Sequence, residues 1–227
     1  MNRKLISLTL DNKLKERVPD LQLALLHYVG CEINDSSHMF QDRTQLFTEH
    51  LRLEYETTTI TELPPIQLFR HAFKQVGSSP SRYRPSAEAL LRRILKGDPF
   101  YFVNSAVDAN NFFSLRYLLP FGIYNASALT SPITCTIGNT EDHYLGLNGR
   151  EISLANKIVL QDVNRPFGSP YVDSQISQVT KETTNCLQVI FSFKGATASS
   201  LHSIAHEVST LFTQVNGGEV RQTTIVE

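Results

Sequence analysis

Polar side chains that can hold a ligand or move a proton gather in two stretches of the chain. Residues 103–111 read VNSAVDANN and contain Asn104, Asp108, Asn110 and Asn111. Residues 166–174 read PFGSPYVDS and contain Phe167, Gly168, Ser169, Asp173 and Ser174. Carboxylates transfer protons, while amides and hydroxyls donate and accept hydrogen bonds. Since apolar segments flank both stretches, we expect them to line a polar pocket.

The same residues have a second interpretation, which the sequence leaves open. Short polar side chains such as Asp108, Asn110 and Asn111 also satisfy backbone groups at turns. Residues 167–170 are typical of a tight loop as well as of the lip of a cleft. The chain has no G-x-S-x-G motif and no Cys-His pairing that would predict a covalent intermediate.

Basic residues are concentrated in one segment, although the net charge of the chain is only -1. Residues 70–96 contain one acidic residue, Glu88, and seven basic ones: Arg70, Lys74, Arg82, Arg84, Arg92, Arg93 and Lys96. Such a segment is typical of a solvated helix face and also of a patch that contacts RNA. We take Arg82, Arg84, Arg92 and Arg93 as candidate RNA contacts, although the net charge argues against a protein coated in positive charge for nucleic acid. No DNA partner is expected.

Length and composition predict one compact domain over residues 1–227, in a cytoplasmic protein without a membrane segment. Three widely separated cysteines suggest free buried thiols instead of disulfides or a zinc ribbon. His202 and His206 have the spacing of two ligands on one helix face but lack a third, so no metal site is predicted. No cofactor is expected.

The elements that position the polar stretches follow from hydrophobic periodicity and from capping residues. We predict strands at 5–10 and 21–29, paired in one sheet, and a helix from residue 36 or 37 to about 55. Further helices are predicted at 64–76 and at 86–96, the latter capped by Ser86. Residues 100–103 are predicted as a strand, and 112–119 as a strand or short helix. The predicted elements after residue 130 are strands at 133–137, 143–147, 157–160, 187–193 and 219–226, with a helix at 197–215.

Several motifs in order carry a family resemblance: RHAFKQVGSSPSRYRPSAEALLRRILKG, VNSAVDANN-x-x-SL, LPFG-x-YN, IVLQD and PFGSP-x-x-DS before T-x-x-TT. Together they span residues 65–193. The chain resembles stand-alone relatives of the B-three/B-four tRNA-binding domain, which is the editing domain of bacterial phenylalanyl-tRNA synthetase β subunits. The resemblance implies an α+β fold with a mixed or antiparallel sheet-rich core, flanking helices and a cleft.

In the synthetase this cleft hydrolyses the ester of mischarged tRNA with an ordered water. The resemblance carries over the family's asparagine as Asn111, a neighbouring pocket position as Asn110 and a proline as Pro120. The family's histidine falls on Gly122, and the glutamate that reads a tyrosine hydroxyl falls near Val189. Because valine cannot pair with a hydroxyl, selection of tyrosine is not expected.

The resemblance leaves two main functions open, beside a third, the hydrolysis of an unrelated small molecule on the same scaffold, because a fold does not fix a function. The first is an RNA-associated, editing-like domain that binds tRNA or aminoacyl-tRNA and hydrolyses the aminoacyl ester in trans. The second is a noncatalytic module whose cleft holds an amino acid or a similar small ligand. Thr180 and Thr184 complete the pocket candidates listed above. The polar substitutes for the missing histidine and glutamate are Asn104, Asp108, Asp173, Ser174, Thr180 and Thr184.

Overall fold

The computed structural model describes residues 5–227, and these form an α+β fold with two four-stranded sheets and a two-stranded hairpin. The first sheet has the order β1-β4-β7-β8, in which β1 runs parallel to β4 and the other pairs are antiparallel. Its strands are β1 (Leu8–Leu10), β4 (Ile133–Ile137), β7 (Ile158–Gln161) and β8 (Pro166–Gly168). The predicted fold class is confirmed.

The second sheet is antiparallel throughout and has the order β10-β2-β9-β3. Its strands are β10 (Glu219–Val226), β2 (Leu21–Val29), β9 (Asn185–Phe193) and β3 (Phe121–Asn125). The hairpin joins β5 (His143–Leu145) to β6 (Glu151–Ser153), with Gly149 at φ 73° in its turn. The predicted pairing of β1 with β2 was wrong, because the two strands lie in different sheets.

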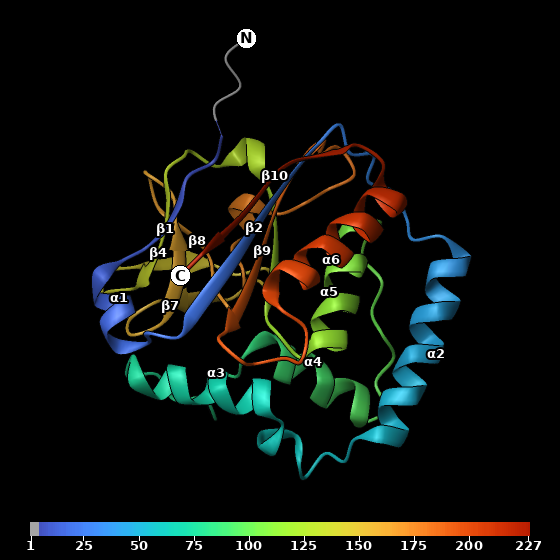
Figure 1. The fold of residues 1–227 in the computed structure, drawn as a ribbon, viewed down its shortest axis with the longest axis horizontal. Helices are drawn as coiled ribbons and strands as arrows, with labels where there is room; N and C mark the ends of the chain where they lie inside the picture. Colours follow the sequence, from blue (N-terminus) through green and yellow to red (C-terminus); the bar gives the residue numbers. More distant parts are fainter. Residues whose placement is uncertain (1–4) are drawn as a thin grey trace.

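Helices cover the second sheet and close one end of the molecule. Figure 1 shows α5 and α6 against one side of β2 and β9, with the first sheet on the other side. The helices are α1 (Asn12–Arg17), α2 (His38–Glu54), α3 (Pro64–Gln75), α4 (Ser86–Leu95), α5 (Ser105–Tyr117) and α6 (Leu201–Asn216). Short 3-10 turns occur at Ile60–Glu62, Ala126–Ala128 and Gln175–Ser177.

The central strand β2 is buried on both faces, which explains its continuous run of apolar residues. Tyr28 stacks on Phe212 of α6 with ring centroids 4.1 Å apart, while Leu23 and Leu25 belong to the same core as the first sheet. Side chains of this size each stabilise the fold by about 1.5–3 kcal/mol when fully buried. Cys31, Cys135 and Cys186 are buried free thiols, as predicted.

One local prediction was wrong in the segment between α4 and β3, and the start of one helix was not predicted. Residues 100–103 form no strand, and the polar stretch that follows is the first half of α5. Asn104 caps this helix by accepting from the N–H of Val107 at 3.0 Å. The helix ends at Leu118, which adopts φ 56°, just before Leu119 and Pro120 lead into β3.

The cap of α4 also differs from the prediction. Pro85 occupies the N-cap position, and Ser86 is the first helical residue with no capping hydrogen bond from its side chain. The N–H of Ser86 instead donates to the carbonyl of Pro170 at 2.8 Å. This bond ties the start of α4 to the loop that follows β8.

A candidate binding cavity with a buried carboxylate

A cavity of about 640 Å³ lies between α4, α5, β3 and the loop after β8. Its walls are mainly apolar, with Phe100, Val103, Val107, Phe121, Ile123 and Val179 among them. Its polar lining includes Ser86, Arg93, Asn110, Asn111, Asn148, Ser169, Asp173, Ser174, Ser177 and Gln178. A cavity of this size and mixed lining is typical of a small-molecule site.

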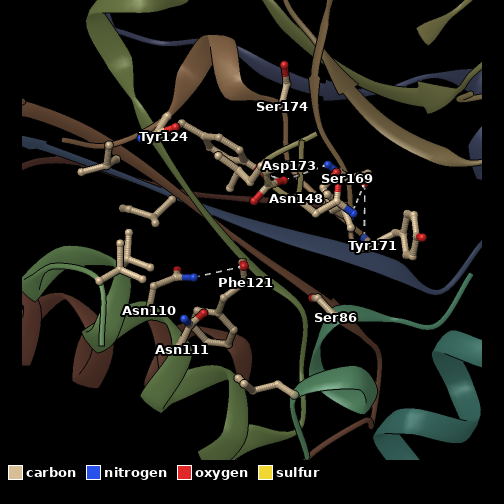
Figure 2. A pocket seen from close by; sticks show the side chains of 18 of the residues that line it. Ser86, Asn110, Asn111, Phe121, Tyr124, Asn148, Ser169, Tyr171, Asp173 and Ser174 are labelled. Atoms are coloured by element: carbon tan, nitrogen blue, oxygen red, sulfur yellow. Dashed lines mark hydrogen bonds between the residues drawn. The ribbon is translucent and has the colours of Figure 1, made fainter. Parts of the chain in front are cut away.

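Asp173 supplies the carboxylate of the cavity. Its Oδ1 accepts a hydrogen bond from the Tyr124 hydroxyl at 2.9 Å and another from the N–H of Ser169 at 3.1 Å. Figure 2 shows the carboxylate between these donors and the cavity, so Oδ2 is the oxygen left to face a ligand. Burial raises the pKa of Asp173 to about 7, against the opposing effect of the two hydrogen bonds.

Two glycines make room for the tyrosine that holds this carboxylate. A Cβ atom at Gly122 would lie 2.0 Å from the Tyr124 hydroxyl oxygen, and one at Gly168 would lie 2.4 Å from it. The Tyr124 side chain therefore passes between β3 and β8 through a slot that only glycine permits on both sides. Burial raises the pKa of Tyr124, with the charge of Asp173 as a further cause, so its hydroxyl remains a donor.

The loop that carries Asp173 is held by a second tyrosine. Ser169 Oγ accepts from the Tyr144 hydroxyl at 3.1 Å and from the N–H of Val172 at 3.1 Å. The Tyr144 hydroxyl also contacts the carbonyl of Val172. Burial raises the pKa of Tyr144, and the Asp173 charge adds to this effect. The loop is thus fixed by side chains from β5 and β3.

Asn110 and Asn111 face the carboxylate across the cavity, as Figure 2 shows, but their amides are in different situations. Asn110 Nδ2 donates to the carbonyl of Phe121 at 3.1 Å, and its Oδ1 accepts from Gln188 Nε2 at 2.9 Å. Gln188 accepts in turn from the Tyr28 hydroxyl at 2.9 Å. The Asn111 side chain makes no hydrogen bond within residues 5–227, so its amide is available to a ligand.

The structure brings together part of the predicted site. The predicted pocket residues that line the cavity are Asn110, Asn111, Ser169, Asp173 and Ser174. Outside the lining lie Asn104, Asp108, Pro120, Gly122, Phe167, Gly168, Thr180 and Thr184. Of the family positions carried over from the resemblance, Asn110 and Asn111 line the cavity and Pro120 does not.

Most of the pocket candidates outside the lining have structural partners. Asp108 is fully buried and accepts from Ser36 Oγ at 2.6 Å and from the N–H of Val103 at 2.8 Å. Burial raises its pKa, although these donors oppose the rise. The carbonyl of Pro120 accepts from the N–H of Phe191, and Phe167 packs edge-on against Tyr124 in the core. Thr184 is exposed on the surface away from the cavity lining.

Of the four candidate RNA contacts, only one lines the cavity, and the others contact neighbouring side chains. Arg93 lines the cavity and is exposed. Arg92 Nε contacts Glu88 at 2.9 Å, and Arg84 Nε approaches the same carboxylate at 4.0 Å. Arg82 lies over the ring of Tyr83, with its Cζ 5.2 Å from the centroid. One basic side chain therefore lines the cavity, and two others surround a buried acid.

The lining residues that the sequence did not predict include Tyr101, Tyr124, Asn148 and Tyr171. A signal for Tyr124 was present, because Gly122 stands two residues before it in an edge strand, where glycine often marks a close approach. Within residues 5–227, no group of three His, Cys, Asp or Glu side chains could hold a metal ion. No helix in this part of the chain is long and apolar enough to cross a bilayer.

The fold and the site define a class of protein. It is an α+β protein in which α4, α5, an edge strand and a loop enclose a cavity with one carboxylate that has no cationic partner. A family model described as the B3/4 domain matches residues 68–219, which is more than half of the chain. The chain therefore belongs to the B3/4 domain family, and the predicted family membership is confirmed.

Two further proteins are similar to this chain. An uncharacterized protein of Bacillus subtilis (strain 168), YhzB, is 28% identical over 213 residues, which are 94% of this chain and 96% of that protein. Among solved structures, an N-terminal fragment of the phenylalanyl-tRNA synthetase β subunit from Pyrococcus horikoshii matches with a TM-score of 0.46 and 13% identity. The match covers 98% of this chain and 51% of that one, so the chain spans about half the length of the fragment.

Proposed function

We propose that the cavity binds the aminoacyl end of an aminoacyl-tRNA and that Asp173 assists hydrolysis of the ester. The link to tRNA rests on membership of the B3/4 family and on the motif resemblance to the editing domain. The observation that carries the chemistry is a carboxylate whose pKa is raised to about 7, with one oxygen turned toward a cavity of 640 Å³. A group with this pKa can both accept and return a proton near neutral pH.

In the proposed reaction, Asp173 accepts a proton from a water as that water attacks the ester carbonyl carbon. The bond between this carbon and the ribose oxygen then breaks, and the proton passes from Asp173 to the leaving oxygen. The products are a free amino acid and a tRNA with its hydroxyl restored. The amide of Asn111 lies across the cavity, where its N–H groups can stabilise the negative charge that develops on the carbonyl oxygen.

The walls favour an amino acid with an apolar side chain. Val103, Val107 and Ile123 offer only apolar contact. Val189, at the position of the family's hydroxyl-reading glutamate, is fully buried in β9 opposite Gly122 and lies outside the lining. A pocket selects a substrate with a hydroxyl when a buried polar group would otherwise be left unpaired. Neither Val189 nor the aliphatic wall supplies such a group, so selection for a hydroxyl is not expected here.

One observation favours the second function, a noncatalytic module for an amino acid or similar ligand. Of the four candidate RNA contacts, Arg93 alone lines the cavity, while Arg84 and Arg92 are engaged by Glu88. Recognition of a phosphate backbone depends on several cations that act together. A single arginine and a single carboxylate in the lining of one cavity instead match the two charges of a free amino acid.

A deacylation assay on a panel of mischarged tRNAs separates the two functions. Hydrolysis by the native chain that is lost in Asp173→Asn and kept in Asp42→Asn, an exposed carboxylate on α2, supports the first. No hydrolysis, together with a rise in melting temperature on addition of a free amino acid, supports the second. If neither occurs and tRNA binding shows no dependence on salt, both functions are rejected.

A further inference from the structure

A second, smaller cavity of about 250 Å³ lies on another part of the molecule. It is lined by residues from β2, β4, β9 and β10, by the segment before β1, and by the turn after β3. The two cavities share no lining residue. Nothing in the function proposed above involves this second cavity, so its chemistry can be judged separately.

A β-bulge places a cation in the small cavity. In the ladder between β10 and β2, Val220 pairs with Tyr28 and Gln222 pairs with His27, which leaves Arg221 without a partner on β2. A bulge of this kind turns a side chain out of its regular alternation. The Arg221 side chain lines the cavity together with that of His27.

The residue after the bulge fixes the neighbouring wall. Gln222 Oε1 accepts from the N–H of Ile6 at 2.9 Å, and Gln222 Nε2 donates to the carbonyl of Ile6 at 2.8 Å. This pair of bonds holds Ile6 against the edge of the second sheet. Arg221 therefore stands between an immobilised segment and a central strand, on a scaffold that does not need a ligand to form.

The charge of Arg221 is uncompensated. Within residues 5–227, no carboxylate lies within ion-pair distance of its guanidinium, and residues 1–4 of the sequence contain no acidic side chain. His27 is 6% exposed, and its Nδ1 has no hydrogen-bond partner in the described part of the chain. Burial and the nearby Arg221 lower the pKa of His27, so the imidazole is neutral at neutral pH.

We propose that this cavity binds the carboxylate of a small organic acid through the Arg221 guanidinium, with His27 beside it and the acid's hydrocarbon chain against the apolar wall. A guanidinium and a carboxylate form two parallel hydrogen bonds. Ile6, Leu129 and Ile133 supply the apolar wall. One cation beside a neutral histidine matches a single negative charge, whereas a phosphate dianion would leave a net charge partly buried.

The test uses butyrate as the probe and the full chain as the protein. The His27 ring signals, followed by NMR, are expected to shift and to saturate at a Kd on the order of 1 mM. Butyramide, which has the same shape without the charge, and inorganic phosphate are titrated in parallel, and both are expected to bind at least about tenfold more weakly. The matched variants are Arg221→Gln, Arg221→Lys and Arg43→Gln, in which Arg43 is an exposed residue of α2.

Arg221→Gln is expected to weaken butyrate binding about tenfold or more, Arg221→Lys to weaken it less, and Arg43→Gln to leave it unchanged. Circular dichroism checks that each variant is folded. If Arg221→Gln does not fold, Arg221→Lys, which keeps the positive charge, provides the test. The proposal is overturned if butyrate causes no shift, if butyramide binds as well as butyrate, or if both Arg221 variants bind like the native chain. Preference for phosphate would also overturn it. None of these results depends on ester hydrolysis at the large cavity.

Discussion

Glu88 and Asp173 are carboxylates in neighbouring regions of the molecule, and they have different partners. Glu88 on α4 is fully buried and contacts Arg70 Nη1 at 3.0 Å and Arg92 Nε at 2.9 Å, with Arg84 Nε at 4.0 Å. Asp173 accepts only from a tyrosine hydroxyl and a backbone N–H. The N–H of Ser86, at the start of α4, donates to Pro170 three residues before Asp173, so the two regions are directly connected.

The difference separates a structural carboxylate from one that is suited to chemistry. Guanidinium groups compensate the charge of Glu88 and join α3 to α4, and removal of such a partner leaves buried charge without compensation. Asp173 has neutral donors alone, so burial raises its pKa to about 7. No arginine pairs with Asp173, although α4 and the loop before it carry Arg84 and Arg92, which contact Glu88.

Replacement of Asp173 by Asn is expected to have the largest effect, a loss of about 10²–10⁴-fold in the rate of ester hydrolysis. The variant keeps the shape of the side chain and its acceptor for Tyr124, but it cannot accept a proton from water. Single-turnover deacylation measures the rate. Asp42→Asn serves as the exposed control, and an unchanged rate in Asp173→Asn would remove Asp173 from the mechanism.

The same variant is expected to be more stable than the native chain at high pH. Because the folded pKa of Asp173 is raised, its contribution to stability is complete below the unfolded pKa of about 3.9 and is lost as pH rises through about 7. At pH 9, Asp173→Asn should therefore unfold with a free energy larger by up to about 4 kcal/mol. Urea denaturation at pH 5 and pH 9 checks this, and an equal difference at both pH values would contradict it.

Replacement of Glu88 by Gln is expected to lower the free energy of unfolding by about 3 kcal/mol, because Arg70 and Arg92 lose a buried counter-charge. Urea denaturation measures the change, with Glu49→Gln on the exposed side of α2 as the control. Arg84→Gln should cost less than about 1 kcal/mol, since Arg84 is half exposed and 4.0 Å away. If Glu88→Gln is neutral, the ion cluster does not hold α3 and α4 together.

The Tyr124→Phe variant should shift the pKa of Asp173 upward by about 1 unit. The variant removes a donor that favours the charged carboxylate while the ring still fills the slot between Gly122 and Gly168. The acid limb of the hydrolysis profile should then move to higher pH. Tyr117→Phe, in which the lost hydroxyl donates to Glu207 at the surface, is the control that should leave the profile in place.

Much of the fold could be predicted from local patterns, since α2, α3, α6 and most strands follow the apolar period and the capping residues. The failure at α5 has a physical cause. Asp108 and Asn110 are typical of turns, but here their side chains bond to Ser36 and Gln188, which are distant in sequence. The separate sheets of β1 and β2 were missed for a related reason, because alternation marks a strand without naming its partner.

The candidate site was predicted in part for the same reasons. Motif order pointed to Asn111 and Asp173, both of which line the cavity. The role of Tyr124 depends on two glycines from different strands, and no local pattern shows that they face the same ring. Arg84 and Arg92 were predicted as RNA contacts, but they lie at the carboxylate of Glu88. The sequence alone does not distinguish a buried glutamate in the first turn of a helix from an exposed one.

The most direct measurement is the pH titration of the Asp173 side-chain carboxyl by ¹³C NMR on the folded native chain, with Asp173→Asn to assign the signal. We predict a midpoint near pH 7, well above the usual range of an exposed aspartate. A midpoint below about pH 4.5, in the range of ordinary aspartates, would contradict it.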